Sequence, residues 1–230
     1  MATAAHTMDA EGPMDHGHAG HPPTSTGLDH KKIAVWAFIG SECMLFASLI
    51  STYLIYKGRS RVGPWPTETV NAAGQTVPGI LDIPVTSAST FVLLMSSLAM
   101  VLALGAVQNK GKPIQPGFTH GLFASSKLWL FVTALLGTVF LCFQAYEFTA
   151  FVHEGLTIRT NLFGSSFFTL TGFHGAHVTV GVLWLLTLLA IDFKRGLGPR
   201  DVINVDIAAL YWHFVDVVWI AIFTLVYLIP

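Results

Sequence analysis

Five long apolar runs constrain the fold of this chain more than any other feature of its sequence. They cover approximately residues 33–56, 84–107, 128–151, 165–191 and 208–229. A helix of about 20 apolar residues crosses the hydrocarbon layer of a bilayer, which is about 30 Å thick. Because that layer offers no water to backbone N–H and C=O groups, long apolar segments cross it as helices. The sequence therefore predicts an all-α membrane protein, with a bundle of five transmembrane helices spanning residues 31–230.

The overall composition agrees with a membrane location. Hydrophobic residues make up 53% of the 230 positions and charged residues 11%, whereas soluble domains average about 25% charged residues. The formal net charge of −1 argues against a nucleic-acid partner, which requires a basic face. Cys43 and Cys142 lie inside apolar runs, so we expect them to be small buried hydrophobic residues and not a disulfide or a metal site.

The segments outside the runs are polar. Residues 1–30 are rich in His, Gly and Pro, which predicts a disordered, His-rich cytoplasmic tail. The stretch from Asp15 to His18 could chelate a metal ion, but flexible His-rich tails do so incidentally, and we predict no metal site in the chain. The longest connection, residues 57–83, contains Gly and Pro at several positions and is expected to be an extended surface loop.

The distribution of basic residues predicts the orientation. The tail side and the second and fourth connections carry Lys31, Lys32, Lys110, Lys112, Lys127, Lys194, Arg195 and Arg200. The opposite side carries Lys57, Arg59, Arg61 and Arg159. Since basic residues near membrane spans favour the cytoplasmic side, we expect the N-terminus to be cytoplasmic and the C-terminus to lie outside.

Polar residues inside the apolar runs are the candidate site. They are Glu42, Gln144, Glu147, His174, His177, His213 and Asp216. The pairs in the third, fourth and fifth runs are three positions apart, which places both members on one face of a helix. A charged residue in the bilayer core costs about 2.5–3.5 kcal/mol on insertion scales, so such groups face protein and pair with one another. The second run contributes no ionisable group.

Two interpretations of these residues are open from the sequence. They could form a proton relay, because burial stabilises a protonated carboxyl and histidine titrates near neutral pH. They could instead form a buried polar network of hydrogen bonds that fixes helix order, the interpretation we favour for the histidines and Asp216. Glu42 has no cation within its own run, so we expect it either to be protonated or to meet a histidine. A haem or metal site is weakly supported, because His174 and His177 share one helix.

Small residues in the fourth run predict close helix contact. Thr171, Gly172 and Gly175 are spaced so that another helix, either of this chain or of a partner subunit, can approach their backbone.

Four stretches in order resemble subunit III of the haem–copper terminal oxidases, the cytochrome c oxidase family. They are Ser41–Phe46 (SECMLF), Phe143–Phe148 (FQAYEF), Gly164–Val178 (GSSFFTLTGFHGAHV) and Tyr211–Trp219 (YWHFVDVVW). The resemblance covers nearly all of residues 33–230. It implies a subunit without a redox centre that packs against subunit I, which carries haem and copper, and assembles with subunit II. The implied complex reduces oxygen to water and pumps protons across a bacterial cytoplasmic membrane.

The resemblance also implies a role for the chain. Subunit III supports assembly, bound phospholipid, proton uptake and resistance to inactivation during turnover. Glu42 matches the family's intramembrane glutamate, which reacts with a hydrophobic carbodiimide. The long form of the family has two further helices before this glutamate, whereas here only the polar tail precedes it.

Several alternatives remain within and outside this family. The five-helix form also resembles subunit III of bacterial quinol oxidases, so either cytochrome c or a quinol is the donor. The sequences of Phe143–Glu147 and Gly172–Gly175 favour the cytochrome c branch and an aa3-type enzyme. A subunit III-like protein of nitric oxide reductases shares the scaffold. A stand-alone transporter or proton channel would need a water path linking Glu42, His177 and Asp216, and an assembly factor would be absent from the mature complex.

Overall fold

The protein is built from five long helices, as the computed structural model shows for residues 29–57, 59–60, 63–70, 75–77, 79–110 and 125–229. The helices are α1 (His30–Tyr56), α2 (Ile83–Gln108), α3 (Ser126–His153), α4 (Leu162–Arg195) and α5 (Val202–Phe223). A 3₁₀ turn, η2 (Pro199–Asp201), precedes α5, and a π-helical turn, η3 (Thr224–Leu228), extends it. All five are long and apolar enough to cross a membrane. The prediction of a five-helix membrane bundle is confirmed.

Side-chain caps explain where four of the helices begin. An oxygen of each cap residue accepts a hydrogen bond from an N–H in the first helical turn, where the backbone has no intrahelical partner. The cap residues are Asp29, Asp82, Ser125 and Asn161. α1 starts at His30, so the helix includes the last residue of the predicted tail. The remainder of that prediction, including the stretch from Asp15 to His18, lies outside the described residues.

The fourth helix is longer than the apolar run predicted, and the fifth begins earlier. At the end of α4, buried Asp192 accepts hydrogen bonds from Ser126 Oγ at 2.6 Å and Leu197 N at 2.8 Å. Its Oδ1 atom also lies 3.5 Å from Lys110 Nζ. One carboxylate thereby joins α2, α3, α4 and the turn that leads into α5. α5 begins at Val202, six residues before the predicted start, because the residues of its first turns include polar ones that the apolar run excluded.

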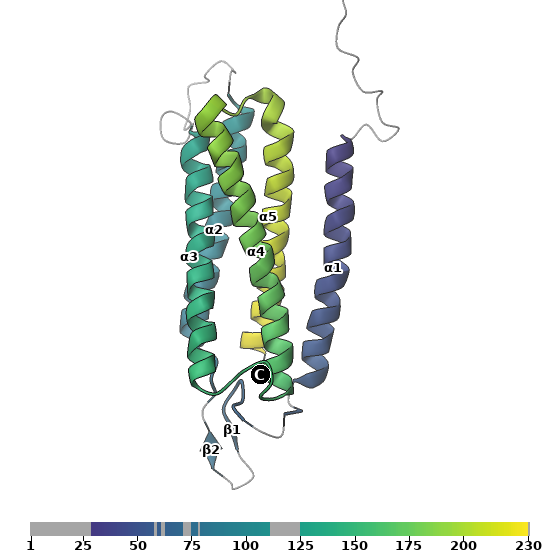
Figure 1. Ribbon diagram of the computed structural model, residues 1–230, viewed down its shortest axis with the longest axis vertical. Helices are drawn as coiled ribbons and strands as arrows, with labels where there is room; N and C mark the ends of the chain where they lie inside the picture. The colour runs from purple at the N-terminus through teal and green to yellow at the C-terminus, as the bar shows by residue number, and fades with distance from the viewer. Residues whose placement is uncertain are drawn as a thin grey trace, which may run out of the picture.

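The helices form a four-helix group with α1 at its side (Figure 1). Within the group, α2 packs along α3 and α5, and α4 packs along α3 and α5. α1 packs against α4 and α5, and only Phe46 and Tyr53 of its side chains are buried. Most of the surface of α1 is therefore left to lipid or to another subunit.

The connection between α1 and α2 differs from the expected extended loop. It contains a short antiparallel ladder between β1 (Thr69–Val70) and β2 (Thr76–Val77), drawn below the helices in Figure 1. We call this end of the bundle the hairpin end, and the end at His30 the tail end. At the hairpin end, Lys57 Nζ donates to the carbonyls of Leu225, at 3.3 Å, and Ile229. Partial burial lowers the pKa of the Lys57 amine. The cation caps the free carbonyls that end the last helix.

Trp212 fixes the spacing of the central helices. Its indole N–H donates to Ser96 Oγ of α2 at 3.0 Å. A Cβ atom built on Gly137 of α3 would lie 2.5 Å from the ring, and one built on Gly181 of α4 would lie 2.8 Å away. Both glycines are therefore required for the ring to fit between α3 and α4.

The small residues of the fourth run behave unequally. A Cβ atom on Gly175 would meet Gln144 Oε1 at 2.7 Å, whereas one on Gly172 would meet nothing within 4 Å. The predicted close approach is confirmed within this chain at Gly175, and at Gly172 an approach by a partner subunit stays a prediction.

Candidate functional site

Glu42 of α1 and His177 of α4 form a pair between the two helices. Glu42 Oε2 lies 3.1 Å from His177 Nε2, and the side chains are 16% and 17% exposed. The other ring nitrogen, His177 Nδ1, lies 2.8 Å from the carbonyl oxygen of Phe173. A carbonyl can only accept, so Nδ1 carries a hydrogen. The short contact at Nε2 then requires a second hydrogen, held either by the imidazolium or by the Glu42 carboxyl. In both forms the pair holds one proton between the two side chains.

Further contacts fix this pair in position. The Phe46 ring centroid lies 5.0 Å from that of His177, and the Tyr211 hydroxyl donates to the His177 carbonyl at 3.0 Å. Toward the tail end, Lys32 Nζ lies 2.7 Å from Asp206 Oδ2 of α5. Because α1 buries so few side chains, these polar contacts carry much of its attachment to α4 and α5.

His174 has a different environment from His177, although it lies only one turn away. Its side chain is fully buried and stacks on Trp219, with 4.9 Å between ring centroids. Neither ring nitrogen has a hydrogen-bond partner among the described residues. Nearby, Gln144 Nε2 donates to the carbonyl of Thr171 at 2.8 Å. These contacts pack α3, α4 and α5 together.

Four hydroxyls of α2 also make polar contacts with other helices, and they were not among the predicted site residues. Thr86 contacts Glu147 of α3, and Thr90 and Ser96 accept from the indole N–H groups of Trp219 and Trp212. Ser97 Oγ lies 2.6 Å from His213 Nδ1. Thr86, Thr90 and Ser97 are separated by four and seven residues, a helical spacing that was visible in the sequence, and Ser96 is adjacent to Ser97.

Asp216 does not have the buried partner that we expected. Its side chain is 3% exposed, and neither carboxyl oxygen has a hydrogen bond of ordinary geometry within the described part of the chain. The Ser97 hydroxyl lies near it but is engaged by His213.

The seven candidate residues do not form one continuous network. Five of them make separate contacts, Glu42 with His177, Gln144 with Thr171, Glu147 with Thr86, and His213 with Ser97. His174 and Asp216 make no side-chain hydrogen bond of ordinary geometry among the described residues. No hydrogen bond joins one contact to another over the described ranges. In the same ranges, no group of three or more His, Cys, Asp and Glu side chains is arranged to hold a metal ion.

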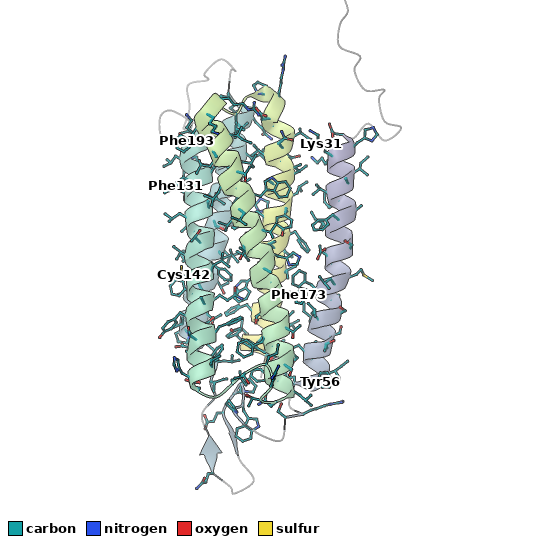
Figure 2. All side chains as sticks on the ribbon, in the orientation of Figure 1. Lys31, Tyr56, Phe131, Cys142, Phe173 and Phe193 are labelled. Carbon is teal, nitrogen blue, oxygen red and sulfur yellow. The ribbon has the colours of Figure 1, made fainter. Side chains whose placement is uncertain are left out.

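The two cysteines are not buried. Cys43 and Cys142 are both exposed on the isolated chain, and Figure 2 labels Cys142 on the flank of α3. An apolar run does not reveal which of its faces is turned inward when the outer face meets lipid.

The chain matches the family model for cytochrome c oxidase subunit III over residues 14–229. The chain belongs to this family. Its curated relatives include cytochrome c oxidase subunit 3 of Bacillus sp. (strain PS3), 41% identical over 199 residues that make up 86% of each chain. Cytochrome c oxidase subunit 3 of Bacillus subtilis is 39% identical over 86% of each chain. Quinol oxidase subunit 3 of Bacillus subtilis is 34% identical over 92% of this chain and 96% of its own.

Membership of the cytochrome c oxidase subunit III family confirms the resemblance drawn from the four motifs. The protein is a multi-pass bacterial membrane protein and a subunit III of the haem–copper oxidase family, which makes it part of a multi-subunit oxidoreductase. Relatives of both the cytochrome c and the quinol type occur, so the family alone leaves the electron donor open.

Proposed function

We propose that the chain is the non-redox subunit III of an aa3-type cytochrome c oxidase that reduces oxygen to water and pumps protons. The cytochrome c relatives given above are 41% and 39% identical and the quinol oxidase relative is 34% identical, which favours cytochrome c. The alternative is a quinol oxidase, whose subunit aligns over more of its length. In either complex subunit I, which carries the haem and copper, packs against this chain, and phospholipid binds at the interface.

In this complex the chain braces subunit I and protects it during turnover, with the N-terminus cytoplasmic. The observation that carries this role is the Glu42–His177 pair, which holds a proton between α1 and α4. The pair joins a helix with little buried surface to the main bundle. Loss of the shared proton would loosen α1 and the surface that it offers to partners.

The test is a Glu42→Gln complex, which keeps the side-chain shape but cannot share a proton with His177. We expect assembly and initial oxygen consumption to match the unaltered enzyme, followed by faster loss of activity during sustained turnover. Cys142→Ser, on the exposed flank of α3, is the matched control and should inactivate at the original rate. Unchanged long-term turnover of Glu42→Gln would remove the protective role.

The donor and the assembly state need a separate experiment. The complex that purifies with this chain in mild detergent would be examined by redox difference spectroscopy, with reduced cytochrome c and a quinol offered in turn. A haem signal with oxygen consumption from reduced cytochrome c supports the proposal, and consumption from the quinol alone selects the alternative. If the chain purifies alone and without haem, and conducts protons in vesicles, both oxidase assignments are wrong and the protein is a transporter or channel.

A further inference from the structure

Another buried carboxyl, that of Glu147, lies at the hairpin end of the bundle, away from the Glu42–His177 pair. Glu147 of α3 is 5% exposed, and it contacts Thr86 of α2, which is fully buried. The hydroxyl of Tyr227 in η3 faces both residues, and its side chain is 4% exposed. The function proposed above makes no use of this cluster.

The single hydroxyl hydrogen of Thr86 can serve only one of its two contacts. Thr86 Oγ1 lies 2.8 Å from the carbonyl oxygen of Asp82 and also contacts Glu147 Oε1. A threonine hydroxyl has one hydrogen, and a carbonyl can only accept. When that hydrogen goes to Asp82, the contact with Glu147 needs a hydrogen from the glutamate. A carboxyl that donates a hydrogen bond is protonated.

The charges around Glu147 also favour its neutral form. The nearest charged neighbour is Asp82, which is negative. α1 contributes Tyr53, whose hydroxyl is buried with no hydrogen-bond partner in the described part of the chain, and η3 contributes Tyr227. α4 contributes the apolar rings of Phe163 and Phe167, which pack on these two tyrosines. Among the described residues no cation forms an ion pair with Glu147, so ionisation would leave a buried charge unpaired.

The Glu147 cluster lies close to the protein surface at the hairpin end. Asp82 lines an open depression of about 380 Å³ at the hairpin end, together with Glu154 and residues 79–84. Thr86 therefore lies between the buried carboxyl and a residue that meets water.

We propose that Glu147 is a proton-binding site of this chain, which at rest carries a proton donated to Thr86 Oγ1 and exchanges it with water at the hairpin end. This site is separate from Glu42–His177, and it does not depend on which donor serves the complex.

Infrared spectroscopy of the purified complex tests the proposal directly. A protonated carboxyl gives a C=O stretching band well above the carboxylate bands. We expect Glu147→Gln to lose one such band relative to the unaltered complex, and Glu42→Gln to retain it. Transfer to D₂O should shift the band as the proton exchanges. A carboxylate band lost in its place would overturn the proposal, and a band that never shifts in D₂O would overturn the exchange path.

Variants at Thr86 keep the test decisive if Glu147→Gln does not assemble. Thr86→Val removes the acceptor, so the C=O band should move to higher frequency without disappearing. Thr86→Ser restores the hydroxyl and should return the band toward its original position. If Glu147 is ionised and Thr86 is the donor, Thr86→Val will leave the protonated-carboxyl region unchanged, which refutes the assignment.

Discussion

Replacing Gly137 with alanine should destabilise the bundle through a single contact. The added Cβ atom would lie 2.5 Å from Cη2 and 2.9 Å from Cζ2 of Trp212, and 3.0 Å from Val182. The ring cannot move aside easily, because its N–H is held by Ser96 and its other side meets Gly181. Overpacking of a dense core costs about 1–3 kcal/mol.

The helix propensity of alanine acts in the opposite direction and must be removed from the comparison. Ala is favoured over Gly by about 1 kcal/mol in a helix interior. Gly172→Ala is the matched control, because its Cβ atom would meet nothing within 4 Å. The difference between the two variants isolates the clash, and we expect Gly137→Ala to be less stable than Gly172→Ala by about 1–3 kcal/mol.

The assay is the denaturant midpoint of the complex in mixed micelles, followed by helical circular dichroism. Trp212→Phe removes the ring atoms nearest to Gly137, so Gly137→Ala should cost less in that background. A coupling energy of about 1–2 kcal/mol is expected for residues in direct contact. Equal midpoints for Gly137→Ala and Gly172→Ala would refute the close packing of α3 on Trp212.

Two further predictions use the same assay. Asp192→Ala removes the acceptor that joins α2, α3 and α4, so it should cost about 2–3 kcal/mol. Lys110→Ala should cost less than about 1 kcal/mol, because the lysine side chain is 43% exposed. Equal losses of stability in the two variants would show that the ion pair, and not the hydrogen bonds to Ser126 and Leu197, holds this junction. Asp216→Asn should cost less than about 1 kcal/mol, because the aspartate makes no ordinary hydrogen bond in the described chain, and a loss of several kcal/mol would reveal an ionised Asp216 with a partner.

The helices could be predicted from the sequence because each is a property of one continuous segment. Length and hydropathy defined all five, and the boundary errors arose where polar residues extend an apolar run, as at the start of α1 and in the first turns of α5. Contacts within one helix were also predictable, since the spacing of His174 and His177 follows from the helical repeat. Their unequal environments were not, because burial depends on which neighbour each residue meets.

The pairing of the candidate site could be predicted only in part. The expectation that Glu42 would be protonated or meet a histidine follows from its lack of a local cation, but the choice of His177, 135 residues away, needed the fold. The hydroxyls of α2 escaped notice because Ser and Thr inside apolar helices commonly bond to their own helix, as Ser89 does here. Only the fold reveals that Thr86 and Ser97 also reach other helices.

The placement of α1 against α4 and α5 has a consequence for biogenesis. The ribosome makes α1 first, while the helices that contact it, and the carbonyls that Lys57 binds, are made last. Until then the first span waits in the bilayer without its partners, surrounded by lipid. A helix in lipid without partners needs apolar side chains around its whole circumference, which α1 has. It also needs a neutral Glu42 carboxyl, because His177 has not yet been synthesised. The sparse burial of α1 is therefore suited to its early insertion, and its polar contacts form when synthesis of the chain is nearly complete.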